Sequence, residues 1–137
     1  MTPTEVVKYM YERDYFSQWM DIKVLDIKEN YCLLEMPIKK EMINGLKTVH
    51  GGVTFALADS ALAFAGNSSG NAGVAQTCSI NFMRAGREGD IFRAEAKLEN
   101  ETRKTAVYDI KITNQNGESV AKFVGTLYKI ERKVVDL

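Results

Sequence analysis

One carboxylate stands alone in an apolar part of the sequence. Asp59 is the only charged residue between His50 and Arg84, and small and apolar residues surround it from Val53 to Ala65. Burying a carboxylate costs free energy unless a partner compensates it or a reaction uses its charge. Asp59 is therefore a candidate catalytic acid or base, and a structural acid bonded to Ser, Thr or backbone groups is the alternative.

The tripeptide His50-Gly51-Gly52 directly precedes this segment and contains the only histidine of the chain. If a helix begins here, its first N–H groups have no partners within the helix and lie at the positive end of its dipole. Glycines would leave these donors uncovered for a carbonyl oxygen, and such donors stabilise the oxyanion formed in acyl transfer. A tight turn into the helix also explains the glycines, and we interpret His50 as a helix-entry residue rather than a general base.

The spacing between the two candidates implies a second chain. Asp59 follows Gly51 by eight residues, which corresponds to about 12 Å along a helix axis. A carbonyl group held at the Gly51 N–H is then out of reach of Asp59 on the same helix. If both act on one substrate, a homodimer with two equivalent composite sites is required.

Two helices are expected to position these groups. The apolar run 53–65 fits a buried strand or a buried helix by periodicity, but its many Ala, Leu and Phe residues and the following Gly66-Asn67 favour a helix. We place this central helix at residues 50–66. The segment Thr2-Pro3-Thr4-Glu5 has the form of a capping box, which predicts an N-terminal helix within residues 1–18.

The second half of the chain is expected to form strands. Residues 91–99 and 105–113 alternate between apolar and polar side chains, as in an antiparallel sheet that is covered on one face. The other expected strands are residues 22–27, 31–38, 74–84 and 120–130. The chain is thus predicted to be a single α+β domain over residues 1–137, with an antiparallel sheet wrapped around a long central helix.

Composition excludes several classes of function. The 18 basic and 18 acidic residues cancel, so no general attraction to nucleic acid is expected. Cys32 and Cys78 fit neither a metal motif nor a disulfide framework, and one histidine makes no metal site. No segment is long and apolar enough to span a membrane and no cleavable signal is visible, so we expect a cytoplasmic protein.

Several stretches together carry a family signal: Asn44 with Val49–Asp59, Ala75–Arg84, Arg87–Asp90, Thr105–Asp109 and Phe123–Thr126. They resemble the hotdog-fold acyl-CoA thioesterases of the phenylacetate-degradation type, within the 4-hydroxybenzoyl-CoA thioesterase superfamily. The resemblance covers about residues 20 to 130 and implies the hotdog fold. It also implies a homodimer that usually pairs into a homotetramer.

The resemblance implies a role for each candidate residue. The Gly51 N–H would bind the thioester carbonyl, supported by His50 and Gly52. Asp59 of the facing subunit would activate water or attack directly to form a mixed anhydride. Asn44 would bind the carbonyl or the water, and Thr77 would hold the water and the acid.

One departure from the family pattern and one further set of candidate residues complete this picture. In the related branch that uses Glu as its acid, a Thr one helical turn later supports the chemistry, and this chain has Ala63 there. Coenzyme A carries phosphates, which basic side chains bind. The candidates are Arg84, Arg87, Arg103 and Lys104.

The expected activity is hydrolysis of an aromatic or medium-chain acyl-CoA, with coenzyme A as part of the substrate and no separate cofactor or metal. Two alternatives remain open. One is an acyl-thioester hydratase or dehydratase that pairs an acid with His50, and the other is a non-catalytic acyl-CoA-binding module.

Overall fold

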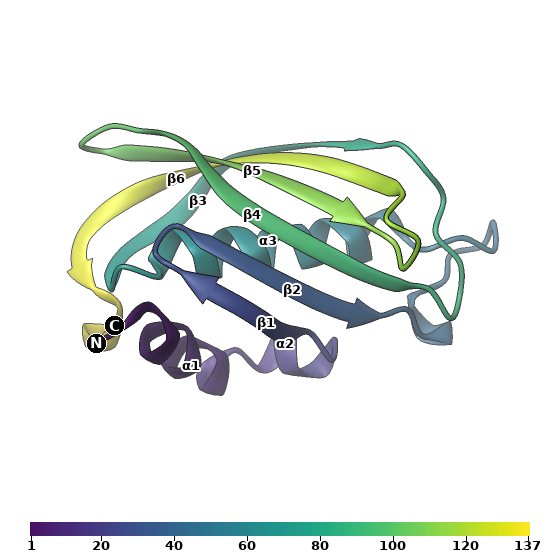
Figure 1. The fold of residues 1–137 in the computed structure, drawn as a ribbon, viewed down its shortest axis with the longest axis horizontal. Coiled ribbons are helices and arrows are strands. Elements are labelled where there is room, and N and C mark those ends of the chain that lie inside the picture. Colours follow the sequence, from purple (N-terminus) through teal and green to yellow (C-terminus); the bar gives the residue numbers. More distant parts are fainter.

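A curved antiparallel sheet encloses one long helix. The computed structural model describes residues 1–137, and Figure 1 shows the helix lying along the concave face of the sheet. The helices are α1 (Pro3–Arg13), α2 (Tyr15–Trp19) and α3 (Gly51–Asn67), with 3-10 turns at Lys40–Met42 and Val134–Asp136. The strands are β1 (Lys23–Lys28), β2 (Tyr31–Pro37), β3 (Asn71–Phe82), β4 (Ile91–Glu101), β5 (Thr105–Thr113) and β6 (Ser119–Lys133). The expected α+β architecture is confirmed.

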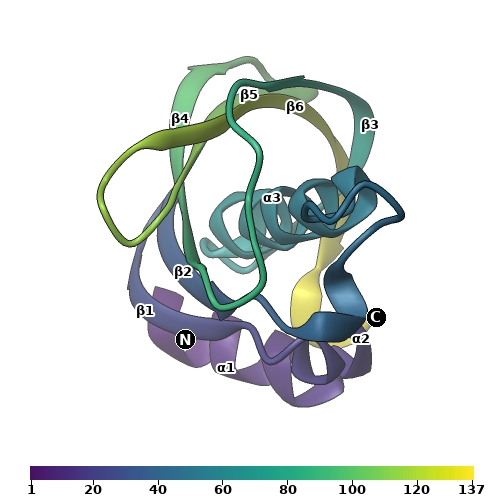
Figure 2. The same cartoon turned by 90° about the vertical axis from the view of Figure 1, so that its right-hand side faces the viewer.

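The six strands follow the order β1-β2-β4-β5-β6-β3, and every neighbouring pair is antiparallel. Strand β3, which follows α3 in the chain, is therefore an edge strand. Figure 2 looks along α3 and shows the sheet curling around it, with α1 and α2 below. No helix is long and apolar enough to cross a bilayer.

Close packing between α3 and the sheet depends on small residues. Leu57, Leu62 and Phe64 on α3 are all fully buried. Gly125 on β6 allows the close approach of Leu62, because a Cβ at this glycine would lie 2.6 Å from Leu62 Cδ2. Gly66 makes similar room for Leu127. The apolar run that suggested a buried helix thus forms the centre of the core.

The N-terminal segment differs from the single helix expected within residues 1–18. Its capping box is present, with reciprocal hydrogen bonds between Thr2 and Glu5. Helix α1 nevertheless ends at Arg13, because Asp14 leaves the helical conformation at φ −94° and ψ 79°. The Asp14 carboxylate instead accepts the N–H of Ser17 and caps α2, which is the competition with helix hydrogen bonding that short polar side chains offer.

Candidate active site

The first N–H group of α3 lacks an acceptor within the chain. Gly52 donates to His50 Nδ1 at 2.9 Å, and Val53 donates to the His50 carbonyl at 2.9 Å. Gly51 donates to neither backbone nor side chain. Its N–H therefore remains free at the positive end of a 17-residue helix, where a carbonyl oxygen or an oxyanion would be stabilised.

His50 is the N-cap residue of α3. Because its Nδ1 accepts the Gly52 N–H, the neutral ring carries its proton on Nε2. Nδ1 is thus engaged in the cap and is not available as a general base. The ring itself is exposed.

A cavity with both polar and apolar walls borders the free N–H. It has a volume of about 330 Å³, and its wall includes Gly51, Thr54, Phe82, Met83 and Arg84. A Cβ at Gly51 would lie 3.2 Å from Phe82 Cζ, so the ring stands directly against the helix start. Glycine at this position therefore combines an uncovered donor with close contact to an aromatic wall.

Asp59 lies two turns further along α3 and is half-buried. Its carboxylate forms no ion pair in the chain, and no hydrogen bond to it is present. Burial raises the pKa of Asp59, and the negative charge of Asp14 adds to the effect. An acid with no structural partner and a raised pKa is suited to accept a proton during a reaction.

Gly51 and Asp59 belong to different cavities of the chain. The one beside Asp59 has a volume of about 550 Å³. Its lining comprises Tyr9, Met10, Arg13, Asp14, Asp59, Leu62, Ala63, Asn67, Gly73, Val74, Ala75, Leu127, Val134 and Leu137. One chain therefore does not bring the donor and the acid to a common cavity.

A continuous row of residues on α3 is left only partly covered. We call it the open stripe, and it consists of Gly52, Phe55, Ala56, Asp59, Ala63 and Gly66. These positions recur every three or four residues and so share one helix face. The neighbouring edge strand β3 is also exposed along most of its length. Asp59 thus lies in the middle of a surface made mainly of small residues, beside the unpaired edge of β3.

Asn44 lies in the loop before α3. Its Oδ1 accepts hydrogen bonds from the Leu46 N–H, the Thr48 N–H and the Thr48 hydroxyl. The amide Nδ2 has no partner among the hydrogen bonds of the loop. Asn44 can therefore offer donors only, which suits binding to a carbonyl oxygen or a water.

Thr77 lies beside a β-bulge, where the register of β3 against β6 shifts between Ala75 and Thr77. Its side chain is exposed, and no hydrogen bond links it to Asp59 of the same chain. The next residue, Cys78, packs against the core, and burial together with the Asp59 charge raises the pKa of its thiol. Within one chain, Thr77 is thus not bonded to the acid, and the neighbouring Cys78 packs against the core.

The four basic candidates lie at opposite ends of the molecule. Arg84 pairs with Glu118 at 3.2 Å, and Arg87 donates to the Lys47 carbonyl at 3.1 Å, near the start of α3. Arg103 and Lys104 form the β4–β5 turn at the other end (Figure 1). One chain does not bring the two pairs together.

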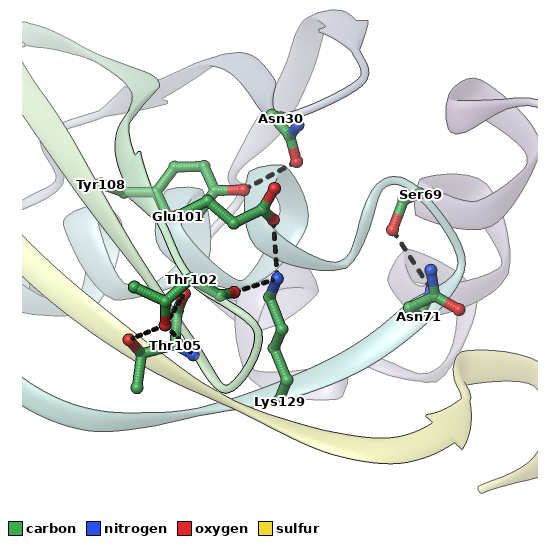
Figure 3. A network of polar contacts seen from close by, with 8 residues as sticks. All are labelled: Asn30, Ser69, Asn71, Glu101, Thr102, Thr105, Tyr108 and Lys129. Carbon is green, nitrogen blue, oxygen red and sulfur yellow. Dashed lines mark hydrogen bonds and ion pairs between the residues drawn. The ribbon is translucent and has the colours of Figure 1, made fainter.

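The turn that holds Arg103 and Lys104 is braced from β6. Lys129 donates to the Thr102 carbonyl at 2.8 Å and pairs with Glu101 at 2.9 Å, as Figure 3 shows. Arg103 lines a shallow cavity of about 500 Å³ together with Lys129, Arg132 and Lys133. No group of three His, Cys, Asp or Glu side chains is placed to hold a metal ion.

The N-terminal helices contribute residues that no motif of the sequence indicates. Tyr9, Met10, Arg13 and Asp14 all line the cavity of Asp59. Their contact with α3 spans more than forty residues of chain, so no local pattern reveals it. The only local signal for a second helix in this segment is Asp14, because aspartate is a residue type that favours helix N-caps.

Comparison with known proteins places the chain in one family. The family model of the thioesterase superfamily matches residues 46–121. The acyl-coenzyme A thioesterase PaaI of Escherichia coli K12 is 40% identical over 88% of this chain and 86% of its own. The solved structure of E. coli PaaI, a protein from the phenylacetic acid degradation operon, superposes with a TM-score of 0.94 at 37% identity, over 96% of this chain and 95% of that one.

A second solved structure extends the comparison to a ligand complex. A hypothetical thioesterase from Streptococcus pneumoniae TIGR4, solved with coenzyme A, superposes with a TM-score of 0.79 at 26% identity. It covers 82% of this chain and 88% of its own. Sequence and fold agree, and the chain belongs to the thioesterase superfamily, with the hotdog fold expected for that family.

Proposed function

We propose that this protein hydrolyses acyl-CoA thioesters to a carboxylic acid and free coenzyme A. The observation that carries the proposal is the presence of two polar groups on α3 without partners in the chain, the Gly51 N–H and the Asp59 carboxylate. An oxyanion donor and a base are the two groups that water attack on a thioester requires. The 40% identity to an acyl-coenzyme A thioesterase supports the same reaction.

The Gly51 N–H binds the thioester carbonyl oxygen and stabilises the negative charge that develops there. Ionised Asp59 takes a proton from water as the water oxygen attacks the carbonyl carbon. The tetrahedral intermediate then expels the coenzyme A thiolate, which receives the proton from Asp59. Direct attack by Asp59 would give a mixed anhydride that water hydrolyses, and it uses the same two groups.

The site is completed by a second copy of the chain. The Gly51 N–H and Asp59 are separated by about 12 Å along α3 and border different cavities. The open stripe and the exposed edge of β3 offer a surface on which a second α3 could pack in the antiparallel sense. Such a dimer would place the Gly51 of one protomer opposite the Asp59 of its partner, and two dimers would form the homotetramer expected from the family.

Asn44 and Thr77 are assigned to orientation of the reacting groups. The free Nδ2 of Asn44 would donate to the carbonyl oxygen or the attacking water. The Thr77 hydroxyl, which has no hydrogen bond to Asp59 within its own chain, would hold water across the subunit interface. Antiparallel pairing would also bring Arg84 and Arg87 of one protomer toward Arg103 and Lys104 of its partner, as ligands for the phosphates of coenzyme A.

We infer an aromatic or medium-chain acyl group for the substrate. The Asp59 cavity has apolar walls from Met10, Leu62, Val74 and Leu127 and a volume of about 550 Å³. The similarity of the whole chain to a protein of a phenylacetic acid degradation operon supports an aryl substrate. The two free cysteines fit the reducing cytoplasm as the location.

A panel of acyl-CoAs tests the activity by release of free thiol. Asp59→Asn should lower turnover by about 10²–10⁴-fold, because it removes the base. Asp26→Asn is the control, since this exposed acid lies on β1, at the opposite sheet edge from β3. Wild-type turnover in Asp59→Asn would exclude Asp59 as the catalytic group, and no thiol release from any acyl-CoA would overturn the function.

Subunit complementation tests the composite site. Gly51→Val and Asp59→Asn should each be inactive alone, because each removes one half of both sites in a homodimer. Refolding the two variants together should restore about a quarter of wild-type activity, since half of the dimers are mixed and each of these has one intact site. Recovery would be absent if both groups acted within one chain.

A further inference from the structure

Asp14 has a fixed position at the junction of α1 and α2. Its Oδ1 accepts the Ser17 N–H at 2.9 Å, and its Oδ2 accepts the Ser17 hydroxyl at 2.6 Å. Both oxygens act as acceptors, as those of an ionised carboxylate do. A negative charge is therefore held at this junction by the first turn of α2.

A buried chain of hydroxyls joins Asp14 to the residue next to Asp59. Ser17 Oγ lies 2.9 Å from Ser60 Oγ, and both serines are buried. Because the Ser17 hydroxyl donates to Asp14, the Ser60 hydroxyl must donate to Ser17. The N-terminal segment is thus anchored to α3 at the residue directly following Asp59.

Asp14 and Asp59 also line the same cavity. The other ionisable side chains that line it are Tyr9 and Arg13 from α1. On β3, burial and the Asp59 charge raise the pKa of the Cys78 thiol, which does not line this cavity. The Arg13 guanidinium lies 3.6 Å from the centre of the Tyr9 ring and donates to the Tyr9 carbonyl. Arg13 forms no ion pair with Asp59.

The remaining walls of the cavity carry no charged side chains. Strands β3 and β6 contribute Gly73, Val74, Ala75 and Leu127, and the C-terminal turn contributes Val134 and Leu137. On α3 itself Asp59 is the only charged residue. Asp14 is therefore the one acidic side chain besides Asp59 among the residues that line this cavity.

We propose that Asp14 is a positioning residue of the active site, which sets the pH range in which Asp59 is ionised and able to act as a base. This inference rests on the hydrolytic function proposed above. A neighbouring like charge disfavours ionisation, and the pKa of Asp59 is raised by burial and by the charge of Asp14. A base with a pKa closer to the working pH accepts a proton from water more readily, so Asp14 makes Asp59 a stronger base.

Titration of Asp59 in the presence and absence of the Asp14 charge tests the inference. Asn and Ser both retain a side-chain acceptor for the α2 cap, so Asp14→Asn and Asp14→Ser remove the charge with little effect on the helix. Carbon-13 NMR of labelled aspartate gives the pKa of Asp59, whose resonance is assigned by its loss in Asp59→Asn. Both Asp14 variants should lower this pKa, and the acid limb of the kcat profile should move to lower pH in parallel.

The matched control is Glu12→Gln, which removes the same charge from an exposed residue of α1. It should leave the titration of Asp59 and the acid limb where the wild type has them. An unchanged titration of Asp59 in both Asp14 variants, or an equal change in Glu12→Gln, would overturn the inference. The titration does not depend on turnover, so the absence of any acyl-CoA hydrolysis would count against the proposed function and not against the Asp14–Asp59 coupling.

Discussion

Helix α3 has two faces that differ in exposure and in chemistry. The buried side of the helix carries Leu57, Leu62 and Phe64, which are fully buried and apolar. The open stripe carries mainly Gly and Ala, with the half-buried Phe55 and the only charge of the helix at Asp59. One face supplies apolar burial, which drives folding, while the other keeps a surface free for a partner and a substrate.

Hydrogen bonding also differs between the core and the edge of α3. No fully buried side-chain polar atom of the protein lacks a partner, as in most native structures. Two groups of α3 without partners lie at the edge of the core: the Gly51 N–H at the helix start and the Asp59 carboxylate on the open stripe. Both lie where a carbonyl group, a water molecule or a second chain can reach them.

The largest effect should follow from a cavity on the buried side of α3. Phe64 is fully buried, and its ring centre lies 6.2 Å from that of Tyr11. Phe64→Ala should lower the free energy of unfolding by about 3–5 kcal/mol, measured by urea denaturation. Phe55→Ala is the matched change on the open stripe and should cost clearly less, because Phe55 is only partly buried. Equal losses would show that the two faces do not differ in their contribution to stability.

On the functional side, the helix start is the next position to test. Gly51→Ala adds a Cβ 3.2 Å from Phe82 Cζ, beside the free N–H. The variant keeps the N–H, but the added methyl group crowds the approach of the thioester carbonyl to it. Turnover of acyl-CoA should therefore fall by up to the factor of about 10²–10³ that loss of one oxyanion donor costs, with little change in stability. Gly45→Ala is the control, because a Cβ there would meet nothing within 4 Å. Similar turnover in both variants would remove Gly51 from the mechanism.

Local patterns in the sequence were sufficient for the helix and most of the sheet. The apolar run after His50 predicted α3, which the structure places at Gly51–Asn67. Alternation predicted β4 and β5, because a sheet with one covered face imposes a period of two. The separation of Gly51 from Asp59 followed from helix rise alone. These features depend on residues that are close in the chain.

Features that depend on distant or competing contacts could not be predicted in this way. The end of α1 at Asp14 reflects a side-chain cap that competes with helix hydrogen bonds. The strand expected at residues 74–84 instead spans Asn71–Phe82 and contains a bulge before Thr77, and bulges redirect side chains locally. The contact of Ser17 with Ser60 crosses 43 residues, and no sequence period encodes it.

The link between the N-terminal segment and α3 should have a smaller effect on stability. Ser17→Ala removes the acceptor of the buried Ser60 hydroxyl, and an unsatisfied buried donor costs about 1–3 kcal/mol. Ser17→Ala combined with Ser60→Ala should cost less than the sum of the single changes, because no hydroxyl is then left without a partner. Chemical denaturation of the three variants measures this coupling, and strictly additive losses would argue against the hydrogen bond.

The smallest expected effect concerns the stability cost of Asp59 itself. Burial and the charge of Asp14 raise the pKa of Asp59 in the folded state above its unfolded value of about 3.9. The contribution of Asp59 to stability is therefore fully present below the unfolded pKa and is lost as the pH rises through the folded pKa. At neutral pH the ionised acid opposes folding, so Asp59→Asn should have a higher Tm than the wild type while being inactive. Thermal unfolding across pH should show this difference shrinking toward about pH 4, and a wild type that is more stable than Asp59→Asn at neutral pH would mean that a partner compensates the charge in the assembled protein.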